Sequence, residues 1–152
     1  MSNKREIGFW FLMIPGILIL LMLVFGQMMA VIDYDFTVSI SMQEPAEIWS
    51  EFGVAMNKAF GVSDTIIYLP LLLFGLIGLW LRKPWGLFTM LGALAISAYW
   101  PVMHIFYVLY AEGLPGFNFT DFTAFITILI IITLYAIWGM YYLYKNQKSL
   151  ME

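Results

Sequence analysis

The chain contains no cysteine, only one histidine and very few charged residues. Without cysteine it cannot form a disulfide, a thiolate zinc site or a cysteine nucleophile. Without a second histidine it cannot hold a haem between two histidines or build a three-histidine zinc site. No basic cluster of the kind that binds nucleic acid is present. We therefore expect neither a metal site nor a nucleic-acid partner, and no motif specifies a cofactor.

The scarcity of charge also indicates whether the protein is suited to water or to lipid. Charged residues make up 11% of the 152 residues, whereas apolar residues make up 62%. A soluble domain has roughly 25% charged residues, and so short a chain cannot hide this much apolar surface from water. The hydrocarbon of a lipid bilayer accepts such a surface. The length allows one domain, so residues 1–152 are predicted to form a single transmembrane domain.

Four apolar runs are candidates for membrane-crossing helices, each of which needs about 20 residues. The runs cover about residues 7–32, 64–81, 87–110 and 122–144. The first is too long for a signal peptide, whose apolar region has about 7–15 residues. Short turns join the second run to the third and the third to the fourth. The pattern predicts an all-α membrane protein, an antiparallel bundle of four transmembrane helices.

An amphipathic stretch fills the second half of the first, longest loop. Glu44 precedes Pro45, as at many helix starts, and apolar residues then recur at steps of three and four. Gly61 is a plausible helix stop. Residues 45–60 are therefore predicted to form a short amphipathic helix. It would lie in the membrane interface or pack over the mouth of the bundle.

Basic residues are confined to alternate segments of the chain. The amino-terminal tail, the turn after the second run and the carboxyl tail carry Lys4, Arg5, Arg82, Lys83, Lys145 and Lys148. Four crossings place these three segments on one side of the membrane. The other side has Lys58 as its single basic residue and collects eight acidic residues. Cytoplasmic loops are rich in Lys and Arg, so both termini are predicted to be cytoplasmic, in a bacterial inner membrane.

The most polar part of any apolar run lies between Ser97 and His104. Ser97, Trp100 and His104 share one face of the third helix. Pro101 has no N–H group, so the carbonyl of Ser97 loses its helical partner. An ionisable residue inside a membrane segment is a functional-site hypothesis by default. The plain alternative is a neutral histidine that one partner satisfies inside the bundle.

Polar residues at the outer ends of the other helices are the candidates to lie opposite His104. The predicted ligand-binding residues are Gln27, Asp33, Asp64, Tyr68, Ser97, Trp100 and His104. A carboxylate close to His104 would form a pair able to relay protons or to hold a polar head group. The alternative is that acids at helix ends are simply solvated or stabilise helix amino-termini.

One hairpin carries a family resemblance. In residues 75–86, Gly75 and Gly78 precede the basic turn Arg82-Lys83-Pro84. This hairpin and the four-run layout resemble the small DoxX-like integral membrane proteins of bacteria. The resemblance implies a four-helix fold and an inner-membrane location, and it assigns no reaction and no functional residue.

Three functions fit the sequence, and the surroundings of His104 separate them. The leading hypothesis is a binding or accessory protein, not an enzyme. It would hold a lipid-like or quinone-like molecule, or a partner's membrane helix, in the outer half of the bundle. A pocket lined by His104, Trp100 and Tyr68 would favour it. The second is a membrane enzyme in which His104 and an outer carboxylate transfer protons. The third is a structural subunit of a larger membrane complex, with His104 packed and no cavity.

Overall fold

The computed structural model describes residues 6–151, which leaves the basic residues Lys4 and Arg5 outside the described part. The described residues form helices and no strand. Four helical stretches are long and apolar enough to cross a membrane, namely Ile7–Ile32, Ala46–Trp80, Pro84–Ala111 and Phe122–Met151. The predicted all-helical class is therefore confirmed, and so is the presence of four helices long and apolar enough to cross a membrane.

The first stretch is α1 (Ile7–Met22), followed without a break by the π-helical segment η1 (Leu23–Met28) and by α2 (Met29–Ile32). Asp33 ends it in an extended conformation, and its carboxylate accepts a 3.0 Å hydrogen bond from the backbone N–H of Phe36. This cap starts a short helix, α3 (Tyr34–Ser39), because an aspartate at the N-cap satisfies a free N–H. The sequence pattern predicts a loop over this segment, so α3 is a difference from the prediction.

The second stretch joins α4 (Ala46–Ser63), the π-helical segment η2 (Asp64–Tyr68) and α5 (Leu69–Trp80). A helix starts after Pro45, where the sequence predicts one. The expected stop at Gly61 is wrong, because the chain stays helical into the second span. A Cβ at Gly61 would lie 2.5 Å from the backbone oxygen of Gln27. Glycine is therefore needed here for close packing of α4 on η1, and it does not end the helix.

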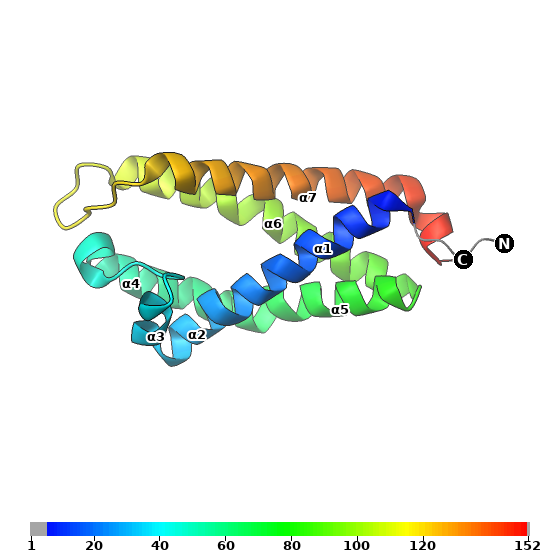
Figure 1. Ribbon diagram of the computed structural model, residues 1–152, viewed down its shortest axis with the longest axis horizontal. Helices are drawn as coiled ribbons and strands as arrows, with labels where there is room; N and C mark the ends of the chain where they lie inside the picture. The colour runs from blue at the N-terminus through cyan, green and yellow to red at the C-terminus, as the bar shows by residue number, and fades with distance from the viewer. Residues whose placement is uncertain (1–5, 152) are drawn as a thin grey trace.

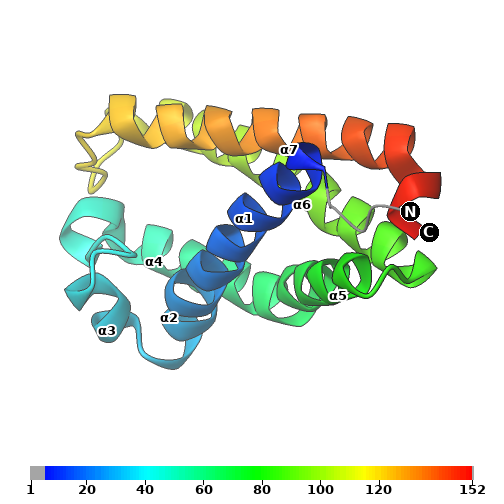
Figure 2. The ribbon, with the colours of Figure 1, turned by 45° about the vertical axis from the view of Figure 1, so that its right-hand side comes forward.

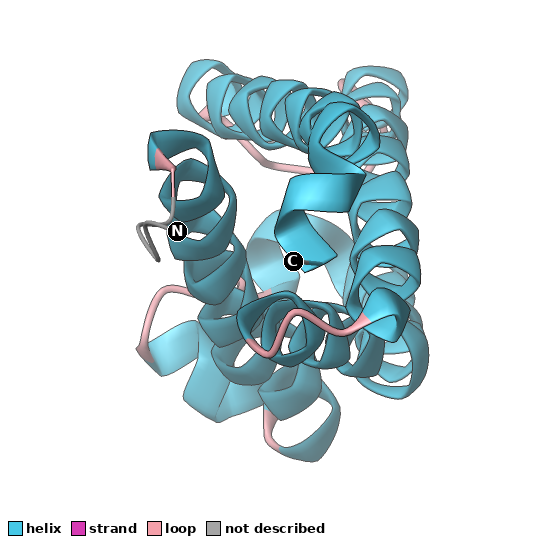
Figure 3. Ribbon diagram, turned by 90° about the vertical axis from the view of Figure 1, so that its right-hand side faces the viewer, coloured by secondary structure: helices cyan, strands magenta, loops and turns pink. Residues whose placement is uncertain are grey.

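The last two stretches are α6 (Pro84–Ala111) and α7 (Phe122–Met151). Figure 1 shows α7 lying along α6, with α5 packed on the other side of α6. In the end-on view of Figure 3, the helices surround a common centre. The start of α1, the turn between α5 and α6 and the end of α7 lie at one end of the molecule (Figure 1). We call this the terminal end, and the opposite end the loop end.

Glycine brings α5 and α6 into backbone contact near the terminal end. A Cβ at Gly75 would lie 2.8 Å from the Cα of Met90, and a Cβ at Gly78 would overlap the Cα of Gly86. In lipid, helices associate through close packing and not through hydrophobic exclusion from water, so small residues at the contact are favourable. Gly75 and Gly78, the two glycines before the basic turn, thus allow the close packing of α5 on α6.

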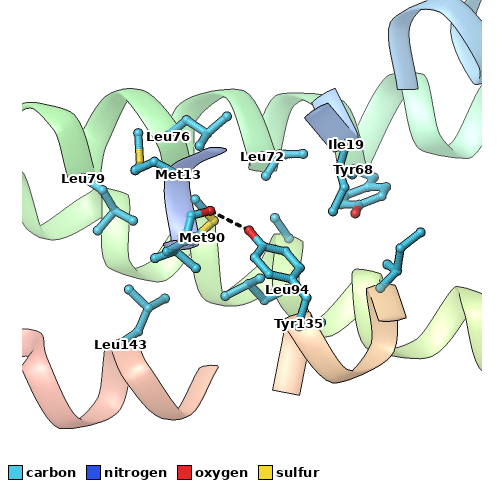
Figure 4. Packing of buried hydrophobic residues seen from close by; sticks show 14 of the residues in the cluster. Met13, Ile19, Tyr68, Leu72, Leu76, Leu79, Met90, Leu94, Tyr135 and Leu143 are labelled. Carbon is cyan, nitrogen blue, oxygen red and sulfur yellow. Dashed lines mark hydrogen bonds between the residues drawn. The ribbon is translucent and has the colours of Figure 1, made fainter. Parts of the chain in front are cut away.

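The tightly packed core fills the middle and the terminal end of the bundle. Figure 4 shows Leu72, Leu76, Met90 and Leu94 interlocked with side chains from α1 and α7. The hydroxyl of Tyr135 donates a 2.7 Å hydrogen bond to the backbone oxygen of Leu12, which ties α7 to α1. The core therefore holds α1 and α7 together along the first half of α1.

Candidate functional site

Two cavities lie where α1 and α7 diverge. At the terminal end the two helices touch, since the ring of Phe11 packs edge-on against Trp138 with centroids 4.7 Å apart. Farther along, η1 turns away from α7 and packs on α4 through Gly61. Figure 2 shows α1 crossing obliquely from α7 toward α2 and α4. The half of α7 nearer the loop end is left opposite η1, and the cavities occupy the space between them.

The larger cavity has a volume of about 460 Å³, within the range of about 300–1,000 Å³ typical of ligand pockets. Its polar lining lies toward the loop end and includes Ser41, Gln43, Glu44, Asn57, His104 and Asp121, together with Gln27. Apolar side chains of α1 and α7, including Met22, Ile128, Leu129 and Ile132, line another part of its wall. The cavity is thus amphipathic, as a site for a molecule with a polar head and an apolar chain should be.

The smaller cavity, of about 70 Å³, adjoins the larger one. It is large enough for several water-sized groups, since a cavity needs roughly 10–15 Å³ to hold one water. Asp64 lines it, together with residues of η1. Both cavities share Gln27 and Trp100, as well as Met22, Met42 and Ile132. Gln27 and Trp100 therefore stand at the junction.

Hydrogen bonds hold part of the polar wall in place. The side-chain amide of Asn57 donates to the Oε1 of Gln43 at 3.1 Å, and the amide of Gln43 donates to the backbone oxygen of Gly26 at 3.4 Å. The hydroxyl of Tyr34 donates to the backbone oxygen of Glu44 at 2.8 Å. Partial burial raises the pKa of the Tyr34 phenol above its usual value, so the phenol stays protonated as a donor.

His104 lines the larger cavity and has a defined tautomer. Its Nδ1 lies 3.0 Å from the backbone oxygen of Trp100. Because a carbonyl oxygen only accepts, Nδ1 carries the proton, and Nε2 of the neutral ring is an acceptor. The ring packs against Phe60 and Trp100, with centroids 5.0 and 5.2 Å away. Within residues 6–151, no carboxylate forms a hydrogen bond with this ring.

Two buried polar atoms at the junction have no hydrogen-bond partner within the described residues. They are the Nε1 of Trp100 and the Oε1 of Gln27. An unpaired buried donor or acceptor costs about 1–3 kcal/mol, so each such atom in a native protein needs an explanation. The side chain of Trp100 lies beside the hydroxyl of Tyr68, and both unpaired atoms are closed off from the cavities, so other atoms of Gln27 and Trp100 line them.

Ser97 and Tyr68 do not line either cavity. Both are buried in the core, and their hydroxyl oxygens lie 2.5 Å apart. Ser97 Oγ also donates to the backbone oxygen of Ala93 at 2.9 Å, which leaves it as acceptor for the hydroxyl of Tyr68. The structure therefore separates Ser97, which bonds Tyr68, from His104, which bonds Trp100. Their predicted roles in ligand binding are better described as a structural link between η2 and α6.

Substitution of Ser97 and substitution of Tyr68 should lower the free energy of unfolding by different amounts. Ser97→Ala leaves the buried hydroxyl of Tyr68 without its acceptor, and we expect a loss of about 1–3 kcal/mol in the free energy of unfolding. Tyr68→Phe removes the hydroxyl that would be left unpaired, so we expect a smaller loss, about 1 kcal/mol. Unfolding of both variants in detergent, followed by circular dichroism, measures the difference. Equal losses, or a larger loss for Tyr68→Phe, would contradict the assignment.

The carboxylates predicted from the sequence are divided between different places. Asp33 is exposed and caps α3 away from the cavities. Asp64 is half-buried and lines the smaller cavity, whereas Asp121 lines the larger one.

Two further residues of the cavity wall, Gln43 and Asn57, were not predicted as site residues from the sequence. Asn57 falls on the polar side of the amphipathic pattern, which is a signal, but no periodicity marks Gln43 in its loop.

The start of α4 and the loop before α7 cover the loop end, and a helix packed over this end is one of the two placements that the sequence left open. Trp49 is 5% exposed and stacks on Phe119 and Tyr107, with centroids 5.2 and 5.9 Å away. The loop before α7 is tied to α4 by Asn118, whose side-chain amide donates to Glu47 O at 2.8 Å and whose backbone N–H donates to Ile48 O at 2.9 Å. Trp49 and Phe119 both line the larger cavity. These aromatic rings therefore form one wall of the cavity at the loop end.

Comparison of the chain with protein-family models, with curated proteins and with solved structures finds no match. The resemblance to DoxX-like proteins stays a prediction.

Proposed function

We propose that this protein is an integral membrane protein that binds one lipid-like or quinone-like molecule between η1 and the outer half of α7. The observation that supports the proposal most is the amphipathic cavity of about 460 Å³, which polar residues line toward the loop end and apolar side chains of α1 and α7 line elsewhere. This function matches the leading sequence hypothesis, that of a binding or accessory protein.

The proposal places the chain in the membrane as an antiparallel bundle with four crossings. The described basic residues at the terminal end, Arg82, Lys83, Lys145 and Lys148, support a cytoplasmic location for that end. At the loop end, Lys58 stands among Asp33, Asp35, Glu44, Glu47, Glu51, Glu112 and Asp121. With this orientation the cavities lie in the outer half of a bacterial inner membrane. The DoxX-like resemblance is consistent with this arrangement.

The walls of the cavity suggest how an amphiphile would lie. Its polar group would meet Gln27, Trp100 and His104, and its apolar part would follow the side chains of Leu129 and Ile132. Ile128 lines the cavity and is also 52% exposed on the outside of α7. An apolar chain can therefore leave the cavity past Ile128 into the surrounding lipid.

A second candidate function is proton transfer by a membrane enzyme, and one observation favours testing it. His104 and Asp121 line the same cavity, so a substrate bound there could meet an imidazole and a carboxylate. General acid–base catalysis needs a donor or acceptor within about 2.6–3.2 Å of the reacting proton. His104→Ala would abolish turnover of such a substrate, whereas in a binding protein it would change affinity alone.

Native mass spectrometry of the gently extracted protein tests the proposed function. We expect one adduct per chain, of the mass of a single-chain lipid or an isoprenoid quinone, that survives extraction in a mild detergent. Double substitution of the junction, Gln27→Met with Trp100→Phe, should strongly reduce this adduct. Unmodified chain in the mildest detergent, and no adduct after amphiphiles are added back, would contradict the proposal.

A further inference from the structure

We propose that the larger cavity selects amphiphiles whose head group is an ammonium cation, such as a long-chain amine, over amphiphiles with a neutral or anionic head group. This inference rests on the proposed function and names the chemical class of its ligand. It follows from three features of the cavity wall, namely the sign of its charges, the hydrogen-bonding character of its polar side chains and the aromatic rings among them.

The charged side chains that line the two cavities within the described part of the chain are all acidic. Glu44 and Asp121 line the larger cavity, and Asp64 lines the smaller one. Neither Glu44 nor Asp121 forms an ion pair with a described residue. Lys58 is exposed, with its Nζ 5.4 Å from the ring centroid of Tyr34, and it does not line either cavity. A cationic head group would therefore gain a charge partner in the larger cavity, whereas an anionic one would meet like charges.

The hydrogen bonds within the wall favour a head group that donates. The side-chain amides of Asn57 and Gln43 each spend one N–H on an acceptor of the protein, the Oε1 of Gln43 and the backbone oxygen of Gly26. The ionised carboxylates of Glu44 and Asp121 can only accept, and neither accepts a hydrogen bond from a described side chain. An ammonium N–H that donates to a carboxylate forms a charge-assisted hydrogen bond, which is roughly twice as strong as a neutral one. The wall thus offers its strongest hydrogen bonds to an ammonium group.

Aromatic rings line the same cavity. The ring centroid of Phe119 lies 5.2 Å from that of Trp49 and 5.3 Å from that of Phe125, and all three residues line the cavity, as does Trp100. A cation within about 6 Å of a ring centroid is attracted to the negative face of the ring, and the attraction is strongest for Trp. Aromatic cages recognise ammonium groups in this way. The rings therefore support a cationic head group independently of the carboxylates.

An organic cation fits the cavity better than a metal ion or a phospholipid head group does. Within the described part of the chain, no group of three or more His, Cys, Asp or Glu residues could hold a metal ion. The volume of about 460 Å³ and the apolar side chains of Leu129 and Ile132 suit a molecule with a hydrocarbon chain. A phosphate would find no Lys or Arg among the described lining residues. The walls therefore favour an amine without a phosphate.

Titration of the purified full chain in a non-ionic detergent with chain-matched probes tests the inference. The probes are dodecylammonium, 1-dodecanol, dodecanoate and the zwitterionic lipid lauroyl lysophosphatidylethanolamine, and native mass spectrometry gives the dissociation constant of each. We expect dodecylammonium to bind about tenfold more tightly than 1-dodecanol, which is the effect of one charge-assisted hydrogen bond. Dodecanoate and the zwitterionic lipid should both bind more weakly than dodecylammonium.

Matched charge substitutions locate the selectivity. Glu44→Gln with Asp121→Asn removes both carboxylates and should bring the ammonium-to-alcohol ratio of affinities close to one, while the affinity for the alcohol is kept. Asparagine caps a helix as well as aspartate does, so the start of α7 is preserved. Glu51→Gln with Glu112→Gln removes two exposed acidic charges that line neither cavity, and it should keep the ratio. Because both double variants have the same net charge, a difference between them reports on the cavity.

The outcomes separate this inference from the proposed function. Binding of 1-dodecanol or dodecanoate as tight as that of dodecylammonium would overturn the ammonium assignment and leave the proposed function standing. Equal loss of the ratio in the two double variants would also overturn it, because the attraction would then come from the acidic loop end as a whole. Equally tight binding of the zwitterionic lipid would contradict the choice of an amine without a phosphate. No binding of any probe, together with no adduct on the extracted protein, would overturn both the inference and the proposed function.

Discussion

Replacing Ala124 and Ile128 together by tryptophan should reduce the amount of bound amphiphile at least tenfold. Both residues line the larger cavity from the first turns of α7. Two indole rings at these positions would fill the space that the apolar chain of the proposed amphiphile needs. Both positions also face outward in part, since Ile128 is 52% exposed and Ala124 is exposed. The new side chains therefore add bulk without entering the packed core. Native mass spectrometry of the variant, compared with the unsubstituted protein, measures the change.

A matched pair of substitutions controls for the general effect of added tryptophan. Ala95 and Ile131 are exposed, and neither lines either of the two cavities described above; Ile131 is 59% exposed on the same helix as Ile128. Ala95→Trp with Ile131→Trp should leave the bound amphiphile at the level of the unsubstituted protein. Equal loss in both double variants, or loss in neither, would count against the cavity as the binding site.

Gly78→Val should destabilise the protein by about 3 kcal/mol, because its side chain would overlap the Cα of Gly86 in the neighbouring helix. Forcing extra carbons into a packed contact typically costs 1–3 kcal/mol, and here the colliding atoms are backbone that cannot rotate away. The α5–α6 hairpin would have to separate. The free energy of unfolding in mixed detergent micelles, followed by circular dichroism, measures this loss.

Gly92→Val is the matched control for the hairpin. It introduces the same side chain into a helical glycine position of α6, where a Cβ would lie 3.4 Å from the Cδ1 of Leu71, the end of a flexible side chain. We expect a loss of at most about 1 kcal/mol. A loss for Gly92→Val as large as that for Gly78→Val would mean that helix propensity, and not backbone contact, decides the effect.

The sequence predicts the helices because lipid leaves the backbone few choices. Every N–H and C=O in a bilayer must be satisfied within the segment, so a long apolar run without charges implies a helix. The prediction was wrong at Gly61 for a physical reason. Glycine ends helices in solution, but it also lets two backbones approach, and only the position of Gln27 across the contact shows which role applies.

The candidate site could be predicted only in part. His104 and Trp100 were singled out as polar residues inside an apolar run, and they do line the cavity. Ser97 lies on the same helical face, but its small side chain bonds Tyr68 in the core. The cavity itself depends on the angle between α1 and α7, which no periodicity encodes. Gln43 lies on an irregular loop, and no periodicity there marks it as a residue of the cavity wall.

The surroundings of Gln27 and Trp100 could not be predicted from the sequence either. Gln27 was a candidate because it is polar near the end of an apolar run, and Trp100 because it shares a face with His104. Whether an indole N–H or an amide oxygen finds a partner depends on neighbours that are distant in the chain. The surroundings of both side chains are therefore a product of the three-dimensional arrangement of η1, η2 and α6.

Photo-labelling with a long-chain alcohol that carries a diazirine near its hydroxyl tests the central claim most directly, when the labelled peptides are mapped by mass spectrometry. If the amphiphile binds between η1 and α7, labels should concentrate in residues 22–27 and 124–132 and should be competed away by unlabelled 1-dodecanol. Labels spread over the lipid-facing side of α5, at exposed residues such as Phe74 and Ile77, with no competition, would contradict it.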